Sequence, residues 1–363
     1  MRIALLTYST KPRGGVVHTL NLAEALAELG AAVTVWTLAR GGDEGFFRAV
    51  DPRVTLQLIA FPDVPDESVT DRILRSIETM RVNFDPADFD IVHAQDCISA
   101  SAVGRCIRTI HHLDEFTTPV LAECHERAVV QPYARICVSR AVAAEVEHKW
   151  GFQPTVIPNG VQASRFAAAA ADTQDASAAR KRWRDEFGTF VLAVGGIEPR
   201  KGSIDLLAAY ATLRRLHPDV QLVFAGGETL FDYRDYRAEF ERLAEELAVE
   251  PVVLGAIADD DLPSLVAAAD VFAFPSVKEG FGLAAMEALA AGRPVVTRDL
   301  PVLREVFGET VRYASDVESL AAQLASALTD TTQADVGRRL AMSMTWQDAA
   351  AEHLRFYAAH LYR

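Results

Sequence analysis

The chain has 363 residues, which is enough for two domains that each bury a core of their own. Half of the residues are hydrophobic and 24% are charged, as in ordinary globular proteins. The formal net charge of −14 argues against a nucleic-acid-binding protein, because such proteins present a basic surface to the phosphate backbone.

The sequence favours a cytoplasmic protein without metal or membrane segments. No stretch approaches the roughly 18 uninterrupted apolar residues of a spanning helix, and Lys11, Pro12 and Arg13 interrupt the short apolar run at the N-terminus. The four cysteines lack Cys-x-x-Cys spacing, so we expect reduced thiols rather than a zinc or redox site. No basic membrane-seeking segment stands out, so peripheral membrane contact is not favoured. The sequence does not indicate an oligomeric state.

The N-terminal segment predicts a parallel sheet. Residues 2–9 form an expected strand, the loop TKPRGG follows, and an apolar periodicity predicts a helix over 16–29 before a second strand at 32–38. The pair Gly14 and Gly15 lacks the Gly-x-Gly-x-x-Gly spacing of dinucleotide-binding proteins. Two interpretations stay open: the pair lets the backbone approach a phosphate or sugar, or it only forms a tight turn.

Polar residues follow the next buried strand of this first half, which begins at residue 90. His93 and Asp96 lie where they are able to bind a ligand, or where they only satisfy the backbone of the loop. A further segment, RTIHHLDEF at 108–116, reads as a strand that ends in two histidines. A neutral imidazole can donate or accept a hydrogen bond to a ligand, although a structural role is commoner for such residues.

The composition changes after residue 161. Residues 162–188 are rich in Ala, Ser, Asp and Gln, and we expect a partly helical linker there. The βα pattern then resumes, with the loop GGIEPRKG at 195–202. Arg200 and Lys201 in this loop lie just before the start of a helix, where cations and free backbone amides together suit a diphosphate.

The most informative stretch is PSVKEGFGLAAMEALAAGRPVV at 275–296, which reads as a strand end, a polar turn and a helix over 281–291. Glu279 and Glu287 frame the turn with seven residues between them, too far around a helix to form a dyad. Gly282 lies at the helix N-terminus, which favours an anion, and at about 1.5 Å rise per residue Glu287 is roughly 7–8 Å further along. The alternative is a surface loop before a core helix, with two solvated glutamates.

The run EGFGLAAME followed by AGRPVV resembles the Glu-x7-Glu signature of the retaining GT-B glycosyltransferases of glycosyltransferase family 4, which include glycogen synthases and bacterial mannosyltransferases. VIPNGV at 156–161 is similar to the segment that leaves the first domain in that family. The resemblance implies an α/β fold with two Rossmann-like domains whose parallel sheets face each other across a cleft. It assigns 1–160, completed by a terminal helix at 346–363, to the acceptor and 161–345 to a nucleotide sugar.

The resemblance also assigns site residues. It makes His111, Lys201 and Glu279 the catalytic candidates, with His112 as the alternative histidine, and it implies no metal ion. Family members usually carry an arginine where this chain has Gly196, so the usual pair of cations on the phosphates rests here on Arg200 and Lys201. Donor binding is assigned to Gly14, Gly15, Arg200, Lys201, Phe281, Gly282, Leu283 and Glu287.

The expected function is therefore a retaining, metal-independent hexosyltransferase that needs no cofactor and uses a UDP- or GDP-sugar as the donor for a soluble acceptor. One alternative is a nucleotide-sugar epimerase of the same build, with an acid and a base drawn from His111, His112, Asp114 and Glu115. The other is a non-catalytic protein that binds a nucleotide sugar as an effector. The Glu279–Glu287 pattern speaks against the epimerase.

Overall fold

The computed structural model describes residues 1–114, 116, 118–227 and 233–361. The chain divides into two compact units. The first comprises Met1–Gly160 together with Thr345–Arg363, and the second comprises Val161–Met344. No described helix combines the length and apolar character needed to cross a bilayer.

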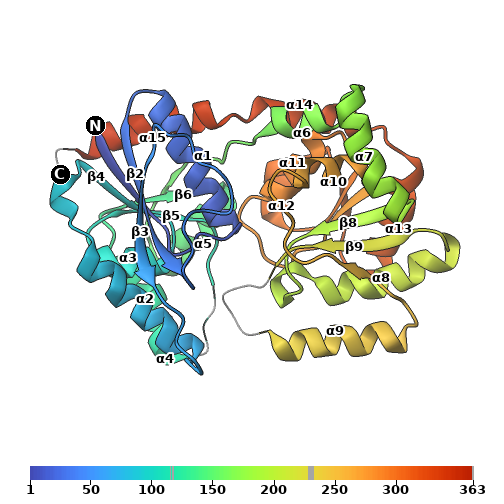
Figure 1. The fold of residues 1–363 in the computed structure, drawn as a ribbon, viewed down its shortest axis with the longest axis horizontal. Helices are drawn as coiled ribbons and strands as arrows, with labels where there is room; N and C mark the ends of the chain where they lie inside the picture. The colour runs from blue at the N-terminus through green and yellow to red at the C-terminus, as the bar shows by residue number, and fades with distance from the viewer. Residues whose placement is uncertain (115, 117, 228–232, 362–363) are drawn as a thin grey trace. The chain divides into compact units, whose positions relative to one another are not determined.

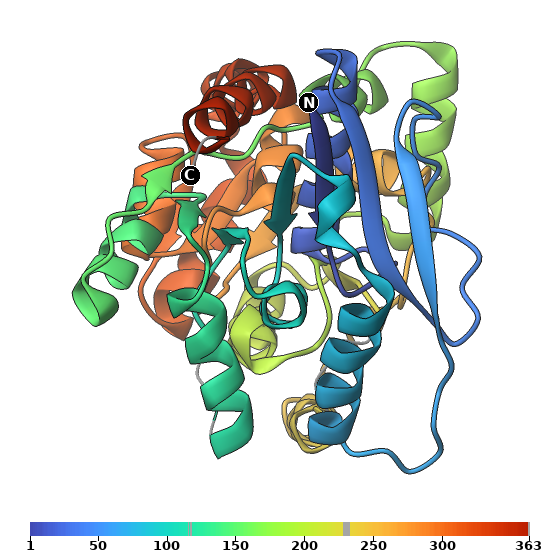
Figure 2. The ribbon, with the colours of Figure 1, turned by 90° about the vertical axis from the view of Figure 1, so that its left-hand side faces the viewer.

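The first unit is a parallel sheet with helices on its faces (Figure 1). Its strands lie in the order β3-β2-β1-β4-β5-β6-β7, and every neighbouring pair is parallel, as the βαβ pattern predicts. Figure 2 shows the long strands β2 and β3 side by side in blue. In chain order the elements are β1 (Arg2–Leu6), α1 (Gly14–Glu28), β2 (Ala32–Arg40), β3 (Thr55–Phe61), α2 (Val69–Asn83), η1 (Pro86–Asp88), β4 (Ile91–Ala94), α3 (Cys97–Val103), β5 (Ile107–Ile110), α4 (Pro119–Val130), β6 (Ala134–Cys137), α5 (Arg140–Trp150), β7 (Thr155–Val156) and α15 (Trp346–His360).

The last helix belongs to the first unit. Helix α15 packs along α1, and its Tyr357 is fully buried. The start of α15 lies so close to Gly160 that a Cβ there would be 2.3 Å from the backbone nitrogen of Trp346. Only glycine fits at that position, so the point where the chain leaves the first unit is packed against the point where it returns.

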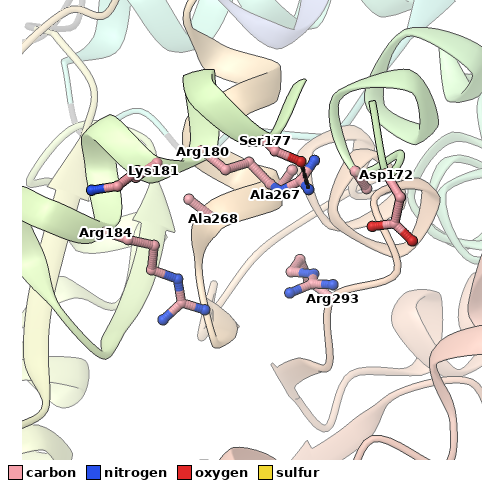
Figure 3. Close-up of a pocket in the computed structure, with 9 residues that line it drawn as sticks. Asp172, Ser177, Arg180, Lys181, Arg184, Ala267, Ala268 and Arg293 are labelled. Carbon is pink, nitrogen blue, oxygen red and sulfur yellow. Dashed lines mark hydrogen bonds between the residues drawn. The ribbon is translucent and has the colours of Figure 1, made fainter. Parts of the chain in front are cut away.

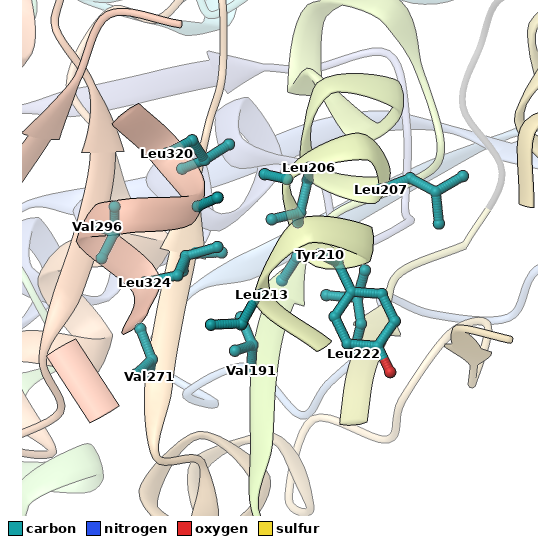
Figure 4. Close-up of a cluster of buried hydrophobic side chains, with 14 of the residues drawn as sticks. Val191, Leu206, Leu207, Tyr210, Leu213, Leu222, Val271, Val296, Leu320 and Leu324 are labelled. Carbon is teal, nitrogen blue, oxygen red and sulfur yellow. The ribbon is translucent and has the colours of Figure 1, made fainter. Parts of the chain in front are cut away.

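The second unit repeats the same architecture, with strand order β10-β9-β8-β11-β12-β13, again all parallel. One face of its sheet packs against α8 and α13, and the buried aliphatic side chains of that layer are shown in Figure 4. Helices α6, α7, α10, α11 and α14 pack against one another. The elements are α6 (Ala163–Ala169), α7 (Gln174–Phe187), β8 (Phe190–Val194), η2 (Pro199–Lys201), α8 (Ser203–Leu216), β9 (Gln221–Ala225), α9 (Arg234–Glu246), β10 (Val252–Val253), α10 (Leu262–Ala268), β11 (Val271–Phe274), α11 (Leu283–Ala290), β12 (Val295–Arg298), α12 (Pro301–Phe307), β13 (Arg312–Ala314), α13 (Val317–Thr329) and α14 (Ala334–Ser343).

The segment 162–188 is more than the partly helical linker that its composition suggests. It forms α6 and α7, which pack on α10 inside the second unit. Trp183 of α7 is 8% exposed and donates from its indole nitrogen to Ser264 Oγ at 2.9 Å. The many alanines of this segment allow close helix packing. They also weaken its apolar periodicity, and for this reason the sequence did not indicate two packed helices here.

Candidate functional site

Two βα loops of the second unit hold each other in place. The first follows β8 and contains η2, and the second follows β11. The backbone N–H of Val277 donates to the carbonyl of Arg200 at 2.9 Å. Gly202 has φ +66°, and a Cβ on it would lie 2.4 Å from the carbonyl oxygen of Pro275. The loops therefore approach at backbone distance, which requires glycine at this point.

The three charged residues predicted in these loops meet at one point. Glu279 Oε1 accepts from Lys201 Nζ at 2.6 Å and from Arg200 Nη1 at 3.1 Å. The side chains of Glu279 and Lys201 are only 10% and 20% exposed. Burial lowers the pKa of Lys201, while the adjoining carboxylate of Glu279 raises it. Two cations are thus fixed beside a carboxylate in a place from which most water is excluded.

Glu198 completes this charge cluster, although the sequence reasoning passed over it. It is 6% exposed and its Oε1 accepts from Arg200 Nη2 at 3.2 Å. The signal was its position inside GGIEPRKG, two residues before Arg200. Arg298 of β12 braces the same region, because its guanidinium donates to the carbonyl of Pro275 and to Asp205 of α8.

The N-terminus of α11 lies directly after the Glu279 loop. The helix begins at Leu283, two residues later than expected, with Gly282 as its N-cap at φ +98°. A Cβ on Gly282 would lie 2.9 Å from Phe307 Cζ, so the residue must be glycine. No side chain of the described residues caps this helix, and its first turn carries no acidic residue. The first-turn N–H groups therefore remain for an anion.

Two residues beside the N-terminus of α11, Phe281 and Ser276, differ in which of their atoms are able to contact a ligand. Phe281 is 3% exposed and packs into the core, which leaves its backbone as the part able to contact a ligand. Ser276, which the sequence reasoning did not single out, is fully buried, and its Oγ has no hydrogen-bond partner among the described residues. An unsatisfied buried hydroxyl costs free energy, so it marks a position where a polar ligand atom would be stabilised.

Glu287 lies in the second turn of α11 and is half-buried. Burial raises its pKa to about 8, with Arg165 acting to lower the value and Asp259 to raise it. Arg165 of α6 pairs with Asp259 at 2.7 Å. Neither residue was predicted to lie near Glu287, since Arg165 falls in the segment read as a linker.

The first unit brings three other predicted residues together. Gly14 and Gly15 are not in a loop as expected; they are the first two residues of α1. His111 directly follows β5, and a Cβ on Gly15 would lie 3.6 Å from its Cδ2 atom. On Gly14, a Cβ would have no atom of the other described residues within 4 Å, its chain neighbours and the backbone of its own helix aside. The glycine pair therefore keeps the start of α1 open beside the imidazole of His111.

His111 stands at one end of a cluster of buried histidines that the sequence did not reveal. The ring of His18 lies edge-on to it, with centroids 4.7 Å apart, and His353 lies 6.2 Å beyond His18. His18 Nδ1 donates to Asn159 Oδ1 at 2.8 Å, which leaves its Nε2 as an acceptor. Burial and the nearby guanidinium of Arg108 hold the pKa of His111 well below its usual range, so a neutral imidazole is presented at this point.

The other polar residues of the first unit have structural partners. His93 hydrogen-bonds Tyr357 Oη and Thr109 Oγ1, both at 2.7 Å. Asp96 caps α3 and also accepts from the N–H of Tyr8. Asp96 therefore satisfies the loop backbone, as one of the two interpretations expected, whereas the hydrogen-bond partners of His93 within the described residues are the side chains of Tyr357 and Thr109 and not the backbone of the loop.

Of the four acid and base candidates of the epimerase alternative, the structure describes His111, His112 and Asp114. His112 Nε2 lies 3.1 Å from Asp114 Oδ1, and Glu115 lies outside the described residues. Within the described ranges, no group of three or more His, Cys, Asp or Glu side chains is arranged to hold a metal ion.

Two family models match the chain and together cover most of it. The model of the glycosyl transferases group 1 matches residues 176–342, and the model of glycosyltransferase family 4 matches residues 12–165. Phosphatidyl-myo-inositol mannosyltransferase of Mycolicibacterium smegmatis is 30% identical over 364 residues, which cover 91% of this chain and 85% of that protein. MMP alpha-(1->4)-mannosyltransferase of Mycolicibacterium hassiacum is 28% identical and matches over 98% of both chains.

Solved structures show the same fold. Sucrose-phosphate synthase from Thermosynechococcus elongatus superposes with a TM-score of 0.81 at 21% identity, covering 100% of this chain and 99% of that one. Anabaena HepE in complex with UDP and glucose gives a TM-score of 0.74 at 20% identity, covering 99% of this chain and 100% of that one. The family models and the curated relatives confirm the family that the resemblance at Glu279–Glu287 indicates. The chain therefore belongs to the group 1 transferases of glycosyltransferase family 4 and is a glycosyltransferase of the GT-B fold class.

Proposed function

We propose that the protein transfers a hexose from a UDP- or GDP-sugar to an acceptor hydroxyl with retention of anomeric configuration and without a metal ion. One observation carries the proposal: Lys201 and Arg200 converge on Glu279 beside the uncapped N-terminus of α11. Such an arrangement fits a pyrophosphate, because its charge is met by two cations and by the N–H groups of a helix.

Each residue of the second unit then has a role set by its contacts. Lys201, Arg200 and the amides of Gly282 and Leu283 stabilise the negative charge that develops on the departing diphosphate. Arg200 supplies the second cation, which family members usually carry as an arginine at the position of Gly196. Glu279 hydrogen-bonds hydroxyls of the transferred sugar, and Glu287, whose raised pKa keeps it largely protonated at neutral pH, hydrogen-bonds the ribose.

In the first unit, the neutral imidazole of His111 is the proposed hydrogen-bond partner of a sugar hydroxyl. Gly14 and Gly15 leave room for the ligand beside it. The His18–Asn159 hydrogen bond fixes the ring against which His111 packs, so the orientation of His111 is built into the fold.

The test combines donor binding with product analysis. UDP-, GDP- and ADP-sugars are first compared by thermal shift, since a donor that binds only the folded protein raises the melting temperature. The best donor, radiolabelled in its sugar, is then incubated with candidate acceptors, and the anomeric configuration of the product is read by NMR. We expect transfer with retention and its loss in Lys201→Ala, whereas Lys149→Ala, an exposed lysine of the first unit, retains it.

The alternatives predict different results. Isomerisation of the donor without transfer would identify the epimerase, and tight donor binding without any turnover would identify a non-catalytic binding protein. Near-normal transfer by Lys201→Ala would refute the role given to that lysine.

A further inference from the structure

The second unit contains a basic pocket of about 410 Å³ that no step of the proposed reaction uses (Figure 3). One wall is a single face of α7, because its lining residues recur at helical spacing. The opposite wall is formed by the end of α10 and by the loop that precedes β12. The residues that matter for the argument are Asp172, Ser177, Arg180, Lys181, Arg184 and Arg293.

The pocket lies where the strands of the sheet begin, whereas Lys201 and Glu279 lie where the strands end. Arg184 donates to Asp270 at 2.6 and 2.8 Å, and Asp270 immediately precedes β11. Arg293 precedes β12 by two residues. Lys201 and Glu279, by contrast, follow the carboxyl ends of β8 and β11. Since strands of four or five residues span roughly 13–17 Å, a ligand in this pocket is separate from a donor bound at the other edge.

Two of the pocket's cations lack a carboxylate partner within the described residues. Arg180 donates to the carbonyls of Ala169 and Ala171 and to Ser177 Oγ. Arg293 donates to the carbonyls of Ala291 and Ala269 at 3.2 and 3.4 Å. These contacts orient the two guanidinium groups, and none of the acceptors is a carboxylate.

The other two cations of the pocket are already paired. Arg184 is held by Asp270, and Lys181 is held by Asp185 of the same helix. Arg293 is half-buried. Burial lowers its pKa, and so do the charges of Arg184, Arg180 and Arg338, while the carboxylate of Asp270 acts in the opposite direction. Four cations thus line one pocket of a chain of net charge −14, and two of them have no carboxylate hydrogen-bond partner among the described residues, which points to an anionic ligand.

We propose that this pocket binds a monophosphorylated sugar or polyol, with the phosphate on Arg180 and Arg293 and hydroxyl groups toward Asp172. Two guanidinium groups match the charge and geometry of one phosphate dianion. The carboxylate of Asp172 accepts from hydroxyls and repels a second phosphate, which favours a single phosphate group. The volume lies in the range of small-molecule pockets. This proposal does not rest on the proposed transferase function.

The test measures binding directly by calorimetry at constant ionic strength, with glucose 6-phosphate as the probe and glucose and inorganic phosphate as separate arms. We expect glucose 6-phosphate to bind more tightly than inorganic phosphate, glucose alone to give no heat, and saturating UDP to leave the binding unchanged. Arg293→Gln and Arg180→Gln should each weaken binding by at least about tenfold. Arg182→Gln is the matched control, because it removes the same charge from α7 at a residue that pairs with Asp261 outside the pocket.

A second variant keeps the test valid if an arginine variant fails to fold. Ser177 is exposed on α7, so Ser177→Asp adds a competing carboxylate beside Arg180 without removing either carbonyl contact. It should also weaken binding at least about tenfold. The proposal is overturned if the wild type binds no glucose 6-phosphate up to about 10 mM, if Ser177→Asp binds as well as Arg182→Gln, or if UDP competes with the sugar phosphate.

Discussion

Replacing Glu279 by glutamine removes the carboxylate on which two cations converge. Lys201 Nζ and Arg200 Nη1 lie 2.6 and 3.1 Å from the same oxygen, Oε1, in a place where the glutamate is only 10% exposed. The glutamine amide keeps a hydrogen-bond acceptor but no charge. The substitution therefore isolates the electrostatic part of the contact.

The size of the effect follows from these distances. At an effective dielectric constant of about 20, unit charges at such separations attract each other by about 5–6 kcal/mol before desolvation is counted. Removing one partner of a buried pair costs about 3–5 kcal/mol in measured cases, because the remaining charge is left without compensation. Since one acceptor remains, we expect Glu279→Gln to lower the free energy of unfolding by about 2–4 kcal/mol.

Urea unfolding of the wild type, Glu279→Gln, Lys201→Met and the double variant measures this quantity as a double-mutant cycle. We expect a coupling energy of about 1–3 kcal/mol between the two residues. Glu250→Gln, an exposed glutamate of the same unit, should change stability by less than about 0.5 kcal/mol. In saturating UDP the deficit of Glu279→Gln should shrink, because the diphosphate supplies the missing negative charge.

Two results would refute this reasoning. A coupling energy near zero would mean that Lys201 and Glu279 do not depend on each other. A deficit that stays the same with and without UDP would mean that the diphosphate does not meet these cations.

The remaining predictions concern α11. Gly282→Ala should lower the free energy of unfolding by about 1–3 kcal/mol more than Gly255→Ala does. Both glycines have positive φ, but of the two only Gly282 has a side chain within 3 Å of the new Cβ. Equal losses of stability in urea unfolding would contradict this prediction. Because the pKa of Glu287 is raised from 4.5 to about 8, the folded protein holds this proton more tightly than the unfolded chain does. Its contribution to stability is full below about pH 4.5 and is lost as the pH rises through about 8. The free energy of unfolding of the wild type relative to Glu287→Gln, measured in urea, should therefore fall between about pH 5 and 9. A rise over this range would contradict the burial of Glu287.

Much of the second unit could be predicted because its site is local in sequence. Each loop directly follows a buried strand, and the ends of neighbouring parallel strands meet at one edge of a sheet. The sequence therefore predicts that Arg200, Lys201 and Glu279 belong to one site. The surroundings of Glu287 were not predictable in this way. Arg165 and Asp259 reach it through the packing of α6, which an alanine-rich composition does not indicate.

The first unit was harder to read, because its site depends on a contact between distant parts of the chain. His18 lies on a helix whose apolar periodicity predicts only a core position. Its contact with His111 arises where α1 meets the end of β5, and its contact with His353 arises where α15 packs along α1. The start of α1 at Gly14 was also missed, since glycine is a poor helix former and the capping position, Arg13, gives no capping signal.

The return of α15 to the first unit has a consequence for synthesis on the ribosome. His93 receives its partner Tyr357 from a helix translated 264 residues later, so the first unit keeps an unfilled apolar and polar surface through most of translation. Val161–Met344 is contiguous and contains its own sheet and helices. The nascent chain is therefore expected to complete its later-made half before its earlier-made half, the reverse of the usual N-to-C order.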